Sequence, residues 1–214
     1  MKATNNPAPI EHRIREGLSR LAAVLRMEDW ARAKTAGLNP TQLSILESLD
    51  GRPGGLGVKD IAFQLGVSQP TATDSIGALE NKLLIAKRAS EIDRRAVHIC
   101  LTDAGSAALR AGDAVSGIAS AMTDALCAED KEKLLVMLVG MIRELQEANV
   151  MPVQRMCVSC RHFRPHAHSG AAKPHHCGFV NAAFGRQELR IDCRDHDAAD
   201  ASSRAAVWDV LQRG

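Results

Sequence analysis

The first part of the chain alternates amphipathic helical segments with short polar breaks. Apolar residues recur at helical spacing from Ile10 onward, which predicts one long helix over residues 10–36. The tetrapeptide Asn-Pro-Thr-Gln at residues 39–42 predicts a second helix start, because asparagine caps, proline suits the first helical position and glutamine closes a capping box. After a glycine-rich loop, residues 58–66 predict a short third helix that ends at a glycine.

We expect a fourth helix that starts after residue 68 and has two distinct faces. Ser68 caps it and Pro70 lies in its first turn. Charged residues 89–95 then predict a hairpin tip, and the two-residue alternation over 97–101 predicts a strand. The expected buried stripe of the helix comprises Ala72, Ile76, Leu79 and Leu83, and its outer face comprises Thr71, Asp74, Ser75 and Ala78.

The pattern beyond the strand predicts more helices. Thr102 and Asp103 cap a helix over about 103–126, and another helix spans about 129–149. The second has apolar residues at a 3-4-3 spacing suited to a partner helix: Leu135, Leu138, Ile142 and Leu145. A last helix from about Ser202 is expected to dock through Val207, Trp208 and Leu211.

These elements predict a mainly α fold with a small β-wing (α+β). Two short tandem helices followed by a charged hairpin make a winged helix-turn-helix, flanked here by long helices. We expect a disordered tail over residues 1–9, this winged-helix domain over 10–150, and a small metal-stapled module with a terminal helix over 151–214.

The physics of the fourth helix fits double-stranded DNA. Its first turn offers backbone N–H groups and a positive dipole end to a phosphate, and its short side chains let it enter the major groove. Arginines on the hairpin tip suit the narrow minor groove. The expected DNA-binding residues are Ser68, Gln69, Thr71, Thr73, Asp74, Ser75, Lys82, Asp93, Arg94 and Arg95.

Two stretches, "LGVSQPTATDSIGALENKLLIAKR" (65–88) and "DRRAVHICLTDAG" (93–105), resemble the multiple-antibiotic-resistance regulator (MarR) family of bacterial transcription factors. The resemblance extends over about 10–149, including the long flanking helices that form an intertwined homodimer in that family. It implies a homodimer that binds a pseudo-palindromic operator, usually as a repressor. By resemblance, Asp93 steadies the wing and Arg94 or Arg95 reaches the minor groove.

The sequence departs from the family at two positions. Leu83 stands where the family very often has a glycine that ends the recognition helix, so the turn after Lys82 is in question. Asp74 stands where a basic or neutral residue is common. A carboxylate there weakens phosphate affinity, but it can accept a hydrogen bond from a cytosine amino group.

Charge and hydropathy indicate the compartment in which the protein works. The net charge of +2 is small, so any basic surface has to be local. The first ten residues are polar, and the longest apolar run, residues 134–142, is too short to span a bilayer. We therefore expect a cytoplasmic protein without a membrane partner, in a compartment where thiols stay reduced.

Cysteine and histidine are concentrated in one stretch of the extension. Cys157-x2-Cys160 forms a knuckle, and Cys177 and Cys193 follow on later segments. In a reducing compartment this pattern indicates a metal site with four thiolate ligands, and a module of about forty residues needs such a staple. Six arginines can offset the charge of the thiolates: Arg155, Arg161, Arg164, Arg186, Arg190 and Arg194.

The spacing of the cysteines does not identify the metal. Tetrahedral sulfur suits zinc, and the same ligands suit an iron–sulfur cluster. His176 and His196 are alternate ligands or orient a cysteine. His166, His168 and His175 are expected in an exposed loop, Cys100 and Cys127 are expected to pack, and unliganded thiols or a switchable disulfide are the competing interpretation of the four cysteines.

Catalysis fits poorly, because the chain has no His-Glu-x-x-His helix, nucleophile elbow or phosphate loop, so we expect no enzyme unless a metal proves to have an open coordination position. We expect a sequence-specific DNA-binding regulator whose metal module tunes the dimer. The alternative is a regulator that answers a small aromatic effector in the dimer cleft and carries a structural zinc module for partner contacts.

Overall fold

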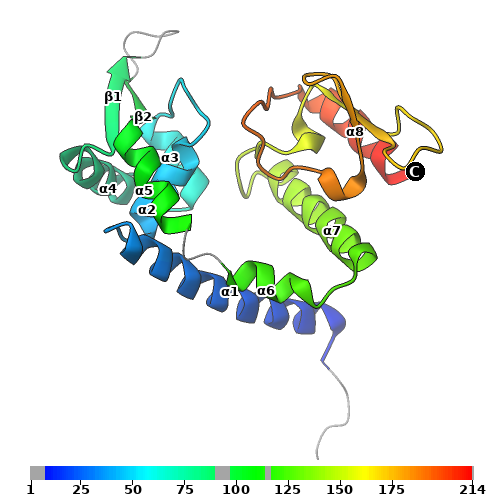
Figure 1. Ribbon diagram of the computed structural model, residues 1–214, viewed down its shortest axis with the longest axis horizontal. Coiled ribbons are helices and arrows are strands. Elements are labelled where there is room, and N and C mark those ends of the chain that lie inside the picture. Colours follow the sequence, from blue (N-terminus) through cyan, green and yellow to red (C-terminus); the bar gives the residue numbers. More distant parts are fainter. Residues whose placement is uncertain (1–7, 90–96, 114–116, 214) are drawn as a thin grey trace, which may run out of the picture.

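The computed structural model of the 214-residue chain describes residues 8–89, 97–113 and 117–213. Figure 1 shows two lobes carried above the long helix α1 (Ile10–Thr35), with the winged part on one side and the cysteine-rich part on the other. Most of the expected tail lies outside the described residues. None of the described helices combines the length and the apolar character needed to cross a membrane.

Helices α2, α3 and α4 form the core of the first lobe. The predicted capping box is confirmed: the Asn39 side chain accepts from the Gln42 backbone N–H at 2.9 Å, and Gln42 returns the bond to the Asn39 N–H. The buried core gathers Leu43, Leu46 and Ile61 with residues of the other helices and the wing. The bounds are α2 Pro40–Leu49, α3 Val58–Leu65 and α4 Gln69–Asn81.

An antiparallel hairpin completes the first lobe. Strands β1 (Ile85–Ala89) and β2 (Val97–Leu101) pair with Ile85 opposite Leu101. The β2 strand was predicted by its alternation, whereas the residues of β1 carry no such pattern. Leu56 adds a bridge to Ile99 and so ties the α2–α3 loop to the hairpin.

Arg32 on α1 joins three helices of this lobe. Its guanidinium contacts Glu47 on α2 at 2.8 Å and Asp113 at the end of α5 (Asp103–Asp113) at 2.8 Å. The Arg32 side chain is only 16% exposed, so these ion pairs are better shielded from water than an ordinary surface pair. Arg32 therefore fixes how α1 crosses the winged helices.

The single helix predicted over about 103–126 is wrong, because α5 and α6 (Ile118–Asp124) are separate. The buried Glu28 carboxylate accepts from the Gly117 N–H at 2.9 Å and the Ile118 N–H at 3.3 Å. Those N–H groups have no partner within α6, and a carboxylate also suits the positive end of a helix. A distant side chain on α1 thus starts α6.

The second lobe packs on α7 (Ala128–Glu147). Its core contains Val139 of α7, Met156 and Phe163 of the cysteine-rich segment, and Trp208 and Leu211 of the last helix. The expected docking of the terminal helix is confirmed, since Trp208 lies 7% exposed beneath the Arg143 guanidinium, 5.1 Å from the ring centre. The elements are η1 Cys157–Ser159, β3 Phe163–Arg164, β4 His175–Cys177, β5 Ala182–Phe184, η2 Arg186–Glu188 and α8 Ala201–Arg213.

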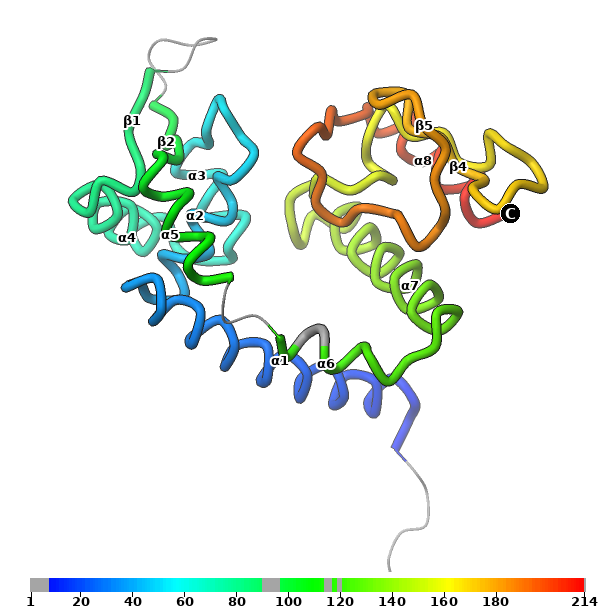
Figure 2. Tube along the Cα trace, in the orientation of Figure 1, coloured from blue at the N-terminus to red at the C-terminus, as the bar shows by residue number. Residues whose placement is uncertain are grey.

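Short connections hold this lobe together. Strands β3, β4 and β5 form a three-stranded antiparallel sheet in that order. On the other side, the Arg161 N–H donates to Asp197 O, and Cys160 bridges to Ala198. Figure 2 shows the resulting path, a loop-rich trace that winds back over α7 and ends in α8. With so few apolar side chains, a lobe of this size has little hydrophobic stabilisation of its own.

Candidate nucleic-acid interface and cysteine pocket

Helix α4 is anchored on one face and free on the other. Ala72, Ile76 and Leu79 are buried, as the sequence predicts. The Ser68 hydroxyl accepts from the Thr71 N–H at 3.2 Å, which confirms the predicted cap. This cap uses one N–H of the first turn, so fewer N–H groups remain for a phosphate than the sequence suggests.

The outer face of α4 presents short polar side chains. Gln69, Thr71, Thr73 and Asp74 are exposed and Ser75 is partly exposed. The Thr73 hydroxyl donates to Gln69 O at 2.9 Å, and the hydroxyls of Thr71 and Ser68 lie 2.8 Å apart. These hydroxyls therefore have local partners that any base contact must replace or share, whereas the carboxylate of Asp74 faces water.

The turn at the end of α4 sets the direction of the Lys82 side chain and the backbone conformation of Leu83. The Lys82 ammonium donates to Gly37 O at 2.8 Å and so is directed at the α1–α2 loop. Leu83 follows with φ 60, and the Leu83 and Leu84 N–H groups close the helix on Glu80 O and Leu79 O. The left-handed turn usual for glycine is kept with a leucine. Leu83 is 75% exposed, so its predicted place in the buried stripe is wrong.

The wing adds a basic residue that the sequence analysis did not single out. Arg88 on β1 is exposed and lies opposite His98 of β2, whose Nδ1 is 2.9 Å from Gly54 O. Lys87 beside it is paired with Glu80 at 2.6 Å. The predicted wing residues Asp93, Arg94 and Arg95 lie outside the described residues. Recognising β1 in the sequence would have marked Arg88.

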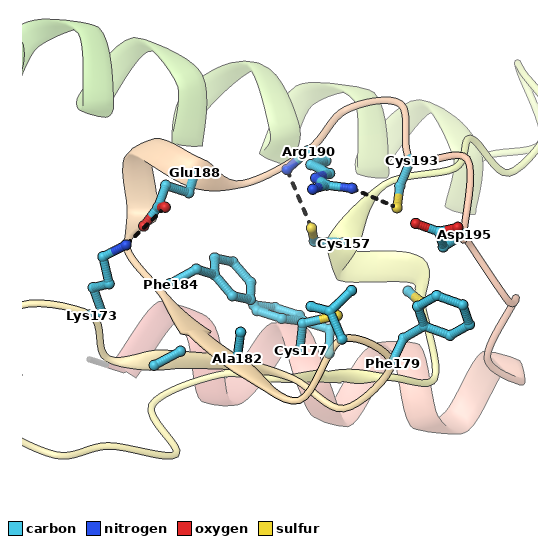
Figure 3. A pocket seen from close by; sticks show the side chains of 14 residues that line it. Cys157, Lys173, Cys177, Phe179, Ala182, Phe184, Glu188, Arg190, Cys193 and Asp195 are labelled. Atoms are coloured by element: carbon cyan, nitrogen blue, oxygen red, sulfur yellow. Dashed lines mark hydrogen bonds and ion pairs between the residues drawn. The ribbon is translucent and has the colours of Figure 1, made fainter. Parts of the chain in front are cut away.

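The second lobe brings all four predicted cysteines to one pocket. Figure 3 labels Cys157, Cys177 and Cys193 around it. Cys157 begins η1 and Cys160 follows it, and the tight turn is closed because the Cys160 N–H donates to Cys157 O at 3.0 Å. Cys177 comes to the pocket at the end of β4, opposite Phe163 of β3. Cys193 is held there because its N–H donates to Arg155 O at 2.9 Å.

The sulfur atoms have specific surroundings. The Arg190 backbone N–H donates to Cys157 Sγ at 3.3 Å, and the Arg190 guanidinium donates to Cys193 Sγ at 3.5 Å. Burial raises the pKa of the Cys157 thiol to about 11, so it is protonated at neutral pH without a cation. Of the six arginines expected around the thiols, Arg190 is the one that lines this pocket within the described residues.

The described residues contain no group of three or more His, Cys, Asp or Glu side chains close enough together to hold a single metal ion. The prediction of a metal therefore stays a prediction. Two cysteines outside the pocket were expected to pack in the core, and Cys100 does so, since it is buried in β2. Cys127 is not a packing residue: it is exposed, and its thiol donates to Asp130 at 3.3 Å at the start of α7.

The histidines do not line the cysteine pocket. His176 pairs with His168 and Asn181, and His196 Nε2 lies 2.9 Å from the Ser159 hydroxyl. His175 was expected in an exposed loop, and this is wrong, because it is fully buried in β4 against Phe163 and Phe184. Burial lowers the pKa of His175 to about 4, so the ring is neutral.

The two lobes touch at the α2–α3 loop. The guanidinium of Arg155 holds the Asp192 carboxylate with two bonds and also donates to Asp50 O at 2.9 Å and Gly51 O at 3.3 Å. Arg194, next to Cys193, pairs with the Asp50 carboxylate at 2.5 Å. We call this set, Asp50, Gly51, Arg155, Asp192 and Arg194, the junction. It links the loop that carries Cys193 to the winged lobe.

The order of elements defines the class. A helix-turn-helix pair, α3 and α4, is followed directly by a two-stranded wing, which is the architecture of a winged helix-turn-helix protein. Residues 38–97 match the model of the MarR family. The match covers α2 through β1 and ends at the first residue of β2, and it supports a regulator of the MarR type.

Solved structures of this class resemble the chain. The transcriptional repressor CouR bound to a 23-mer DNA duplex is 25% identical with a TM-score of 0.53, over 65% of this chain and 99% of that one. The Staphylococcus aureus MepR–DNA complex is 22% identical with a TM-score of 0.52, over 60% and 94%. CouR from Rhodococcus jostii RHA1 bound to p-coumaroyl-CoA is 17% identical with a TM-score of 0.53, over 69% and 98%. Roughly a third of this chain has no counterpart in them.

Proposed function

We propose that the chain is a transcriptional repressor that binds an operator as a homodimer, with α4 in the major groove and the wing at the minor groove. The observation that carries this is the outer face of α4, where exposed short polar side chains stand beside the wing on a helix anchored by its opposite face. The MarR family match and the DNA complex of the repressor CouR support it.

The apolar stripe of α1 supports the homodimer. Ile14, Leu18 and Leu21 are 53%, 41% and 46% exposed, although their spacing is that of a buried face. Met137, Met141 and Leu145 of α7 are exposed as well. An apolar stripe of this extent is rarely left in water, and a second copy of the chain offers the same surface in return.

The proposal is tested by adding a negative charge to α4. Gln69→Glu places a carboxylate at the exposed first position of the helix, where it favours the helix and repels phosphate. We expect duplex affinity, measured by fluorescence anisotropy at low salt, to fall about tenfold or more, in keeping with loss of roughly 1.4 kcal/mol. The matched control is Gln212→Glu on the exposed face of α8, which should bind as the wild type does. Equal affinity of both variants would refute this use of α4.

We further propose that the cysteine-rich lobe tunes this activity. The junction supports the idea, because Arg194 follows Cys193 directly and pairs with Asp50, in the loop that Leu56 connects to the wing strand β2. A change at the cysteines that moves residues 190–194 therefore acts on the base of the wing.

A second candidate places the signal elsewhere. In it, a small aromatic molecule binds the dimer cleft and the cysteines hold a purely structural zinc. The complex of CouR from Rhodococcus jostii RHA1 with p-coumaroyl-CoA is the observation that favours it. It predicts that an aromatic acid or its thioester weakens DNA binding, and that chelation of the metal unfolds the lobe without changing operator affinity.

A further inference from the structure

Four cysteines from three segments of the chain line the cysteine pocket, together with the carboxylates of Glu188 and Asp195. The volume of the pocket is about 330 Å³. In Figure 3, Cys157 and Cys193 lie on one side of the pocket and Cys177 on the other. No histidine lines it and Glu188 is paired with Lys173 at 3.0 Å, so the four thiols are the main ligands that the pocket offers, and they suit a group that thiolates bind.

The size of the pocket favours a group larger than one ion. Four thiolates about 2.3 Å from one zinc stand roughly 3.8 Å from each other, which leaves no cavity between them. The four cysteines here line a pocket of about 330 Å³. A polynuclear group is wider, because its metal and sulfide atoms lie between the protein thiolates.

The walls favour the same kind of group. Phe179, Val180 and Phe184 line the pocket with apolar surface, and two of the sulfur atoms already accept N–H bonds from Arg190. Hydrogen bonds to sulfur and a protected environment are the means by which proteins stabilise iron–sulfur clusters and set their potentials. The guanidinium also offsets the negative charge of a cluster with four thiolates.

We propose that this pocket binds an iron–sulfur cluster through Cys157, Cys160, Cys177 and Cys193. Each ligand binds as a thiolate, so its thiol gives up a proton to water on binding. The proposal deepens the tuning role given to this lobe, but cluster binding itself does not require that the chain binds DNA.

The test is metal analysis of the full chain purified without oxygen, or loaded anaerobically with sulfide and a mixture of ferrous and ferric iron. We expect broad visible absorption and equal amounts of iron and acid-labile sulfide. Cys177→Ala should lose both, and the matched control Cys127→Ala, which changes an exposed thiol outside the pocket, should keep both. A colourless protein with one zinc and no iron per chain would overturn the proposal, as would a Cys177→Ala variant that keeps its cluster.

A milder variant separates loss of the ligand from loss of the fold. Arg190→Gln keeps all four thiols and the backbone N–H on Cys157, and it removes the cation that donates to Cys193. We expect the cluster to form with a more negative midpoint potential, because a reduced cluster carries more negative charge. An unchanged potential would place the cluster elsewhere.

DNA binding is measured on the same samples. A colourless chain that still binds DNA contradicts the cluster and leaves the repressor proposal standing. A chain with a cluster that fails to bind DNA contradicts the repressor proposal alone.

Discussion

At the scale of single residues, Leu83 shows how a sequence departure translates into strain. The turn after α4 keeps its left-handed residue, with φ 60, although a leucine occupies it. Such a conformation costs a non-glycine residue roughly 1–2 kcal/mol, a cost that glycine avoids. Glycine also makes the unfolded chain more flexible, which lowers the stability of the folded state by about 0.5–1 kcal/mol. Since the Leu83 side chain is 75% exposed, little packing is lost when it is removed.

We therefore predict that Leu83→Gly raises the free energy of unfolding by up to about 1 kcal/mol in urea titrations. Leu83→Ala is the control, because it removes the same exposed side chain but keeps the strain. If Leu83→Ala stabilised the protein as much as Leu83→Gly, the cause would be the exposed leucine side chain and not the strained backbone conformation.

The chemistry of individual residues was predicted unevenly from the sequence. Ser68, Asn39 and Gln42 act within three residues of themselves, so their caps follow from local sequence. The four cysteines were found through their clustering, and the structure gathers them around one pocket. The burial of His175 was missed, because it depends on Phe184, which reaches it through strand pairing rather than through proximity in sequence.

At the scale of elements, the start of α6 is set by a long-range contact. Glu28 caps it from 89 residues away, and no local pattern at Gly117 announces such a partner. The sheet formed by β3, β4 and β5 has strands of two or three residues, too short for any alternation to be visible. The long amphipathic helices α1 and α7, in contrast, were predicted to within a few residues.

The stripe on α1 carries an element-scale prediction. Leu21→Glu puts a charge into the proposed dimer interface, where burying an unpaired carboxylate is costly. We expect a mostly monomeric protein by analytical ultracentrifugation and at least tenfold weaker operator binding. Ser19→Glu, on the exposed face of the same helix outside the stripe, should stay dimeric. A dimeric Leu21→Glu variant would show that α1 does not form the interface.

At the scale of the whole molecule, the contacts of the junction connect the loop beside the cysteine pocket to the winged lobe. Arg155 lies 8% exposed and serves both sides, with Asp192 on one and the carbonyls of Asp50 and Gly51 on the other. Gly51 has φ +66 and lies under the Arg194 side chain, so a Cβ there would meet Arg194 Cγ at 2.6 Å. The close approach of the two lobes depends on this glycine.

Removing the ion pair between Arg194 and Asp50 should weaken the coupling between the two lobes. In Asp50→Ala, Arg194 loses its partner while α4 and the cysteines are untouched. If cluster loading changes the operator affinity of the wild type about fivefold or more, as is usual for coupled sites, the change should largely disappear in this variant. Asp209→Ala, on the exposed face of α8, should respond as the wild type does. A full response in Asp50→Ala would mean that the signal travels by another route.

The central claim is that a dimer of this chain reads DNA through α4, and selection from random duplexes by the purified protein tests it most directly. Two identical recognition helices facing one side of the duplex should enrich a pseudo-palindrome with half-sites about one helical turn, roughly 10 base pairs, apart. The Gln69→Glu variant should enrich this site about tenfold less strongly than the wild type, in keeping with its weaker binding. Recovery of no preferred sequence, or equal enrichment by Gln69→Glu, would contradict the account.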